Sequence, residues 1–407
     1  MSLAAAPAIE GSGTGIARLA EVLVVLMVLS VPLEGLIVVP GLGSLTVIVG
    51  ILTGLCAMLY VLTGAGLRPI AAEHCSLALF VLFSGFAIAW SENATQSVFR
   101  FISYAQLWIF AWLIWQFAQT QPALERLLKS YVAGSVIVAL LLVHAVLTFD
   151  IESVGGGEIR ISAFGINPNE QALGLAIAVP MSAYLITRSH GFVRTAFVFS
   201  IPALAVGVII TLSRGAFLSL AMALVASLII LRNGGEKRVA WGYVFATFGA
   251  VAIVLSMGVD KIIARILQLF SMIARGDLNS REIIWRVGLE HLPDSFFFGV
   301  GPGAYSAVTG SELSEPVSAH NTYLSIFVET GAIGFVLFFA PVILILTKLH
   351  RSSRTVRNLL WGIAIPLGLG VLITQWDYRK PFWFVLAIGI GLIAAQNITR
   401  QRQGGST

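Results

Sequence analysis

Runs of about 20 apolar residues recur along the whole chain, and no soluble stretch of domain size separates them. A helix of that length crosses the hydrocarbon region of a bilayer. Soluble domains are about 25% charged, whereas this chain is 11% charged and 57% hydrophobic. The sequence therefore predicts an all-α polytopic membrane protein.

Twelve runs are predicted to span the membrane, so residues 1–407 form a single integral membrane domain, a bundle of about 12 transmembrane helices. No cleavable signal peptide is predicted, because the first run is long and only Arg18 precedes it as a basic residue. The spans cover residues 20–39, 44–63, 75–90, 99–119, 131–149, 173–187, 193–210, 216–231, 241–258, 323–347, 359–374 and 382–395.

Basic residues are unevenly shared between the two sides of the predicted bundle. With the N-terminus inside, fifteen Lys and Arg residues fall on the cytoplasmic side, an excess typical of cytoplasmic loops. The even number of spans then places both termini in the cytoplasm. The cytoplasmic loops account for the net charge of +5, so no nucleic-acid partner is expected. Five basic residues remain in the opposite short loops: Arg100, Arg160, Arg214, Arg379 and Lys380.

One loop, residues 260–321 between spans nine and ten, is much longer than the others and is predicted on the outer side. It begins with an amphipathic run, DKIIARILQLFSMIARGD, and continues with a second short helix in SREIIWRVGLEHL. The next segment, FFFGVGPGAY, follows no strand of a βαβ unit, so its glycines do not indicate a nucleotide site. The loop is predicted to be a small lid with short helices on the outer face.

Charged side chains near a bilayer are costly, and they mark either function or ion pairs. Arg214, in TLSRGAFLSL, lies in so short a connection that it must stay at the membrane surface. It is predicted either to bind phosphate oxygens or to extend to lipid headgroups. Arg286, in REIIWRVGLE, is predicted either to bind an anion or to pair with Glu282 and Glu290.

Arg160 is a third candidate cation, in a loop that contains Gly155–Gly157 and the Asn-Pro-Asn at residues 167–169. These residues indicate a shaped loop or a plain turn, and Asn169 is a candidate for substrate binding. His320 stands directly before span ten. A neutral imidazole there is predicted either to accept a proton from a hydroxyl or to cap the helix.

Further polar residues accompany His320. Asn321 follows it directly and is a candidate for substrate binding. Asp377, in QWDYRK, is predicted to orient His320, to bind substrate, or to pair with Arg379 or Lys380. Glu329 lies about two turns into span ten and is predicted to be a structural partner. There is no HExxH, no carboxylate pair with metal-ligand spacing and no Asp-x-Asp in the outer loops. Neither a metal nor another cofactor is therefore expected.

Three motifs in this order resemble those of the O-antigen ligase and polymerase superfamily. They are TLSRGAFLSL after span seven, WRVGLEHLPDSFFFGVGPGAYSAV in the long loop, and HNTYLSIFVETGAIGF at its exit. The upstream segment RISAFGINPNEQALGLAIAVP fits the same pattern. The resemblance implies a multi-span enzyme of the bacterial inner membrane with a periplasmic active site. Such an enzyme moves a glycan from undecaprenyl pyrophosphate to a hydroxyl acceptor.

The resemblance also implies roles for individual residues. Arg214 and Arg286 match the arginines of the family, His320 matches its histidine, and Asp377 matches a late acidic residue less securely. The expected reaction is metal-independent and inverts the anomeric centre: the arginines stabilise the departing pyrophosphate, with Arg160 as a helper, and His320 is the base. A ligase would use lipid A-core as acceptor, and a polymerase a second lipid-linked glycan.

Two other functions remain open from the residues alone. Twelve spans with polar residues are also common in secondary transporters, although these place ionisable groups at the midplane of two related halves. The chain could alternatively be a binding or scaffold component of a polysaccharide export complex. Expected partners are the lipid-linked donor, the acceptor and membrane lipids.

Overall fold

The computed structural model describes residues 14–36, 38–41, 43–148, 165–256, 281–313 and 315–404. In these ranges a long helix overlaps each predicted span, which confirms the all-α polytopic class. The long helices are α1 (Thr14–Ser30), α2 (Leu45–Leu62), α3 (Ala72–Phe86, continued by η1, Ala87–Trp90), α4 (Ala94–Phe117), α5 (Gln121–Leu147), α6 (Pro168–Arg188), α7 (Gly191–Ile210), α8 (Arg214–Asn233), α9 (Lys237–Ser256), α14 (Thr322–Leu349), α15 (Arg354–Gly370) and α16 (Lys380–Gly404).

Nine helices of the described chain are long and apolar enough to cross a membrane. The long helices outside this set are α1, α9 and α15, of which α1 and α15 have 17 residues each. The count of twelve spans therefore stays a prediction. α6 is the most enclosed of the nine, with 83% of its apolar window buried, and it packs against α5, α7, α8 and α15.

The first predicted span, residues 20–39, is wrong at both ends. α1 already begins at Thr14 and ends at Ser30. Pro32 disfavours helical backbone at the residue before it, so the helix ends there despite the apolar residues that follow. These residues instead form turns and a short antiparallel pair, β1 (Val38–Val39) with β2 (Gly43–Ser44).

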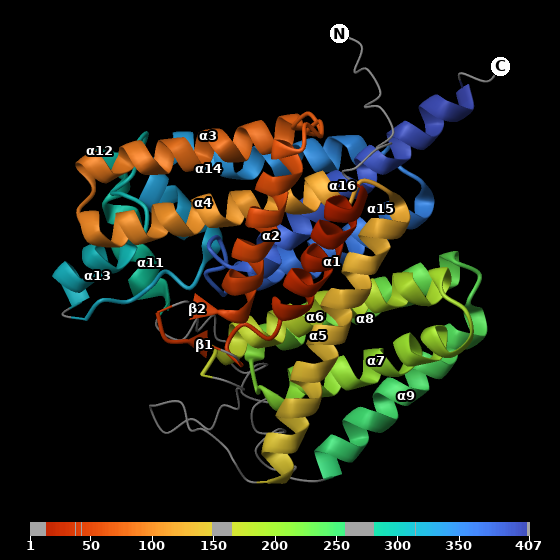
Figure 1. The fold of residues 1–407 in the computed structure, drawn as a ribbon. Coiled ribbons are helices and arrows are strands. Elements are labelled where there is room, and N and C mark those ends of the chain that lie inside the picture. The colour runs from red at the N-terminus through yellow and green to blue at the C-terminus, as the bar shows by residue number, and fades with distance from the viewer. Residues whose placement is uncertain are drawn as a thin grey trace.

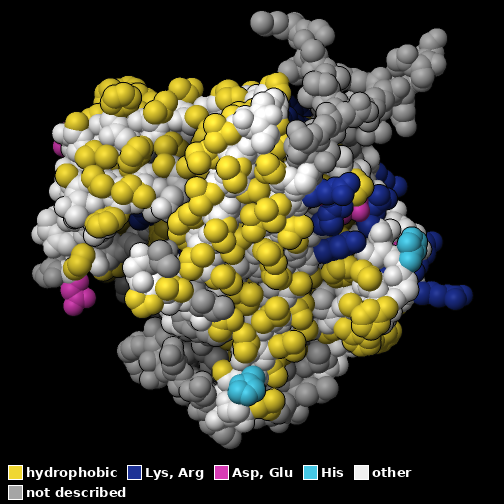
Figure 2. All heavy atoms as spheres, in the orientation of Figure 1, with side chains coloured by type: hydrophobic (Ala, Val, Ile, Leu, Met, Phe, Trp, Pro, Cys, Tyr) yellow, Lys and Arg dark blue, Asp and Glu magenta, His cyan; other side chains and the backbone are white. Residues whose placement is uncertain are grey.

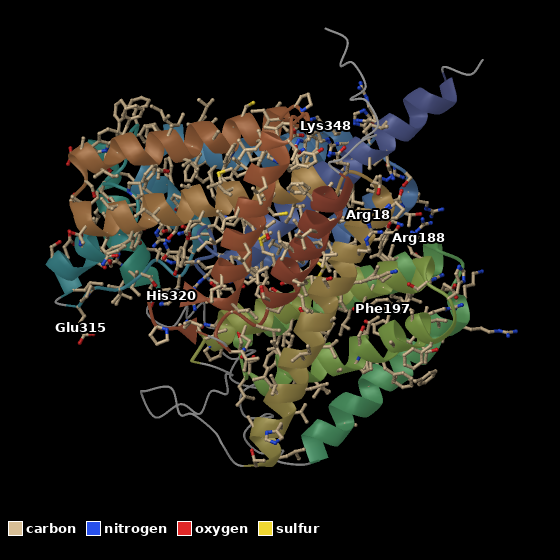
Figure 3. The ribbon with its side chains drawn as sticks, viewed as in Figure 1. Arg18, Arg188, Phe197, Glu315, His320 and Lys348 are labelled. Carbon is tan, nitrogen blue, oxygen red and sulfur yellow. The ribbon has the colours of Figure 1, made fainter. Side chains whose placement is uncertain are left out.

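Three short helices lie at one end of the bundle: α11 (Arg281–Glu290), α12 (Leu292–Ser295) and α13 (Tyr305–Leu313). Figure 1 shows them far from the C-terminal end of α16. His320 and Glu315 lie at the same end as these helices, whereas Arg18, Arg188 and Lys348 lie at the other (Figure 3). The described bundle thus separates the predicted outer and inner residues. Which end faces the cytoplasm stays a prediction.

Apolar side chains cover the outside of the bundle. Figure 2 shows hydrophobic side chains across the face formed by α1, α2 and α5, with Lys and Arg gathered at one end of it. Large residues such as Leu62, Phe192 and Phe245 are 72–87% exposed. So large an exposed apolar surface requires a lipid environment.

The segment FFFGVGPG of the long loop, residues 296–303 (the glycine segment), packs into a break in α14. The helix is interrupted at Gly331, with φ 63° and ψ −171°. Around it the N–H of Gly301 donates to the carbonyl of Glu329 at 2.9 Å, and the N–H of Ala332 donates to the carbonyl of Phe296 at 2.8 Å. Gly299 has φ +71°, and a Cβ there would lie 2.3 Å from the carbonyl oxygen of Glu329. The glycines therefore allow two backbones to meet.

Candidate functional site

The loop between α15 and α16, residues 371–379 (the α15–α16 loop), holds the start of α14. The N–H of Thr322 donates to the carbonyl of Val371 at 2.8 Å. The Thr322 hydroxyl donates to the carbonyl of Thr374 at 2.8 Å and accepts from the N–H of Trp376 at 2.8 Å. These bonds fix the first turn of α14 against the loop, and with it the position of His320.

His320 lies at a sharp turn of the chain before α14. Its φ is 46°, in the left-handed region that is uncommon for residues other than glycine. Asn321, not His320, caps the helix, because the Asn321 Oδ1 accepts from the N–H of Leu324 at 3.1 Å. The His320 side chain is partly exposed, and its Nε2 lies 3.4 Å from the Ser318 Oγ. Strained backbone clusters at functional sites, so the geometry favours a functional role for His320.

Arg214 begins α8 and lies at the same α15–α16 loop. Ser213 is the N-cap of the helix, and Leu212 before it has a left-handed φ of 55°. A Cβ on Gly215 would lie 1.4 Å from the Cδ1 of Ile373, so the first turn of α8 packs directly on the loop. Only the backbone of Arg214 is described; its side chain lies outside the described part. The starts of α8 and α14 therefore contact one loop.

The Asn-Pro-Asn motif forms the start of α6 rather than a plain turn. Asn167 is the N-cap, and its Oδ1 accepts from the N–H of Asn169 at 2.9 Å, with Pro168 at the favoured first position. The Ser213 Oγ donates to the Asn169 Oδ1 at 2.7 Å. Asn169 thus joins the start of α6 to the residue before Arg214, so the motif and TLSRGAF meet in space.

Arg286 lies on α11 with an exposed side chain. The predicted ion pairs to Glu282 and Glu290 do not form within the described chain. The neighbouring Trp285 connects α11 to the segment before α14, because its Nε1 donates to the carbonyl of Ala319 at 2.9 Å. The helix that carries Arg286 is therefore fixed one residue from His320.

Asp377 is fully buried and pairs with a residue that the sequence-based prediction missed. Its Oδ2 accepts from the Arg100 Nη1 at 3.0 Å and from the Tyr104 hydroxyl at 2.7 Å. The predicted pairing with Arg379 or Lys380 is wrong, since both cations have other partners. The sequence signal that could have found Arg100 is that it is one of the five basic residues predicted on the outer side. Through its bonds to Arg100 and Tyr104, Asp377 anchors the α15–α16 loop to α4.

Arg379 pairs with Glu170 of α6 at 2.7 Å, and Lys380 pairs with Glu34. Burial lowers the pKa of Arg379, but the charge of the adjacent Glu170 carboxylate outweighs this effect. The pKa of Arg379 therefore lies above its ordinary value. The guanidinium of Arg100 also stacks on the ring of Tyr378, with its Cζ 3.8 Å from the ring centroid. The end of the bundle that carries His320 thus holds a dense group of cations with carboxylate partners.

Glu329 has the contacts of a structural partner. It is 1% exposed, and its Oε2 accepts from the N–H of Gly303 at 2.7 Å. Its Oε1 accepts from the Ser325 hydroxyl at 3.1 Å, and that hydroxyl accepts from the Gln375 Nε2 at 2.5 Å. One carboxylate therefore links the glycine segment, α14 and the α15–α16 loop.

Two predicted features lie outside the described residues: Arg160, and the amphipathic run at the start of the long loop. The short helices α11, α12 and α13 of that loop lie within them. In the part of the chain that the structure describes, no three His, Cys, Asp or Glu side chains are grouped as metal ligands would be.

Residues 196–339 match the family model described as O-antigen ligase. The match runs from α7 into α14, and it includes Arg214, Arg286, His320 and the glycine segment that packs against Glu329. Asn169 and Asp377 lie outside it. No curated protein matches the chain. This match supports the placement of the chain in the O-antigen ligase and polymerase superfamily that its motifs resemble.

Proposed function

We propose that the chain is a glycosyltransferase of the ligase type, which moves a glycan from undecaprenyl pyrophosphate to a hydroxyl of lipid A-core. One observation carries the proposal: the helix starts that hold Arg214 and His320 both contact the α15–α16 loop. α11, which carries Arg286, is tied to Ala319 directly before His320. Three segments that are far apart in sequence therefore meet at one end of the bundle.

The proposed reaction is a single displacement. The acceptor oxygen attacks the anomeric carbon, and its proton passes to His320. The bond from that carbon to the pyrophosphate oxygen breaks, and undecaprenyl pyrophosphate leaves with the electron pair. Attack opposite to the leaving group inverts the anomeric centre. A well-placed general base contributes about 10²–10⁴-fold to such a step.

Negative charge grows on the leaving pyrophosphate, so fixed cations stabilise the transition state more than the ground state. Arg214 and Arg286 are proposed for this role, with Arg160 as a helper, because guanidinium groups stay charged and match phosphate oxygens. The starts of α6 and α8 add positive helix ends, since Asn169 and Ser213 bring them together.

The proposed setting is the bacterial inner membrane, with both termini in the cytoplasm and the site facing the periplasm. Lipid-borne donors and acceptors reach a site at the membrane surface by lateral diffusion. The separation of Arg18, Arg188 and Lys348 from His320 supports this orientation (Figure 3).

A repeat-unit polymerase would use the same donor chemistry, so it is the second candidate. The test is reconstitution of the full chain in proteoliposomes with an undecaprenyl-linked glycan. Lipid A-core and a second lipid-linked repeat are offered together as acceptors. A glycan joined to lipid A-core supports the ligase, and a lengthened lipid-linked glycan supports the polymerase.

A transporter is another alternative, and the break in α14 is a feature that carriers use for substrate binding. Here, however, the backbone of the glycine segment fills the break. It is hydrogen-bonded to α14 by the N–H of Gly301 and by the N–H that Ala332 of α14 donates to the segment. Uptake of glycan into vesicles without any transfer product would favour the transporter over both enzymes.

A further inference from the structure

A cavity of about 790 Å³ lies between α1, α2, α4, α5, α6 and the α15–α16 loop. Its volume is in the upper part of the range for small-molecule sites, about 300–1,000 Å³. Inside the bundle the wall is apolar, with Met27, Leu113, Val138 and Leu175 among its residues. The proposed transfer mechanism uses none of these side chains.

The outer end of the cavity is polar and carries the two ion pairs. Arg379 and Lys380 line it together with their partners Glu170 and Glu34. Trp376 also lines it. The Trp376 Nε1 and the Arg379 Nε are buried without a hydrogen-bond partner in the described structure. Unsatisfied buried donors are costly, so this end favours a ligand that is rich in acceptor oxygens.

The side of the cavity reaches the lipid-facing surface between α2 and α4. Ile51 and Gly54 of α2 and Ile109 of α4 line it. Ile51 and Ile109 are 54% and 46% exposed, so neither is enclosed by the packing of the bundle. Both helices are candidate membrane spans. A hydrocarbon chain can therefore enter from the bilayer without crossing water.

The polar end adjoins the candidate active site. Glu170 follows Asn169, which accepts the hydrogen bond from Ser213 beside Arg214. Trp376 donates its N–H to Thr322 at the start of α14. A head group at this end would therefore lie beside the starts of α8 and α14.

We infer that this cavity binds the hydrocarbon chain of a diphosphate lipid, which enters between α2 and α4 and places its diphosphate at Arg379 and Lys380. The inference rests on the proposed function, in which that lipid is the undecaprenyl pyrophosphate donor. Glu170 and Glu34 hold the two cations while the cavity is empty, and the diphosphate replaces them as counter-ions. Arg379 and Lys380 hold the diphosphate beside the start of α8, and Arg214 and Arg286 act on it during transfer.

The lipid chain is tested by filling the cavity from α2. Gly54 lines the cavity, and a Cβ there meets no atom within 4 Å, so Gly54→Phe adds a ring without a backbone clash. The matched control is Gly242→Phe on α9, where a Cβ also meets nothing within 4 Å and the residue is exposed. Gly50→Leu is a second cavity variant, whose Cβ would make ordinary contact with Met27 at 3.7 Å.

Binding of undecaprenyl pyrophosphate to the purified full chain is measured by native mass spectrometry. We expect Gly54→Phe and Gly50→Leu to weaken it at least about tenfold, and Gly242→Phe to leave it unchanged. Inorganic diphosphate is expected to bind much more weakly than the lipid, because it lacks the chain. Equal lipid binding by the Gly54 and Gly242 variants, or equal binding of inorganic diphosphate and lipid, overturns the inference.

The head group is tested with Arg379→Gln. This variant is expected to weaken binding of undecaprenyl pyrophosphate while leaving undecaprenol binding unchanged, since the alcohol has no charge to lose. Unchanged binding of both lipids would refute the assignment of the diphosphate to Arg379. His320→Ala separates this inference from the proposed function: it is expected to bind the lipid normally and to fail only in transfer.

Discussion

The Ser213 hydroxyl donates a hydrogen bond of 2.7 Å to the side-chain carbonyl oxygen of Asn169. Ser213 caps α8, and Asn169 lies in the first turn of α6. The bond therefore fixes two helix starts, one of which begins with Arg214. The position of that arginine depends on a residue 44 positions earlier in the chain.

Asn169→Ala is expected to reduce transfer strongly while costing little stability. A neutral hydrogen bond contributes about 1 kcal/mol, but its loss frees the start of α8 and misplaces Arg214. Transfer by proteoliposomes and thermal unfolding are measured side by side. Ser200→Ala is the matched control, because it removes the buried Ser200–Ser182 bond of 2.9 Å away from the site. Equal transfer by both variants would show that Asn169 only stabilises the fold.

Asp377→Asn is expected to destabilise the protein, because it leaves the Arg100 guanidinium largely buried without its counter-ion. Breaking a buried pair from one side costs about 3–5 kcal/mol. The measurement is the shift in thermal unfolding of the detergent-purified chain. Glu21→Gln is the control: it breaks the more exposed Arg126–Glu21 pair, for which about 0–1 kcal/mol is expected. Similar shifts for the two variants would contradict an anchoring role for Asp377.

Gly299→Ala is expected to release the glycine segment from α14. Its φ is +71°, and the new Cβ would lie 2.3 Å from the carbonyl oxygen of Glu329. The expected result is faster limited proteolysis of residues 281–313 and loss of transfer. Gly310→Ala is the control, since its Cβ would make only ordinary contact with Pro316 at 3.5 Å. A proteolysis rate for Gly299→Ala that matches the control would argue against the packing described for α14.

Transfer is expected to survive removal of divalent cations, because Arg214 and Arg286 are proposed to supply the positive charge at the pyrophosphate. Activity is measured with and without EDTA on proteoliposomes prepared in chelator-treated buffers. The Arg214→Gln variant, assayed in parallel, is expected to lose transfer under both conditions. Loss of wild-type transfer on chelation, with rescue by Mg²⁺, would show that the arginines do not suffice.

The sequence predicts the helices well, because hydrophobic runs fix their positions. The errors are at boundaries where charge or proline intervenes. The predicted fifth span begins at residue 131, whereas α5 begins at Gln121. Its first turns carry Glu125, Arg126 and Lys129, which lower the hydropathy of the window, yet Thr120 caps the helix and Pro122 suits its first turn.

The candidate site was only partly predictable. His320 and Arg214 stand out because ionisable residues beside apolar runs are rare. The partner of Asp377 could not be predicted, because Arg100 lies 277 residues away and only the packing of α4 on the α15–α16 loop brings the two together. The bond between Ser213 and Asn169 could not be predicted either, because the two residues are 44 positions apart in the sequence. Sequence patterns reveal local structure, whereas these contacts depend on tertiary packing.

The most direct test of the account is transfer by His320→Ala in proteoliposomes that contain an undecaprenyl-linked glycan and both acceptors. The account predicts that this variant inserts, unfolds at the wild-type temperature and binds the lipid donor. Its transfer rate is expected to fall by about 10²–10⁴-fold, the contribution of a general base. Transfer at the wild-type rate by a folded His320→Ala protein would contradict the central claim that His320 deprotonates the acceptor.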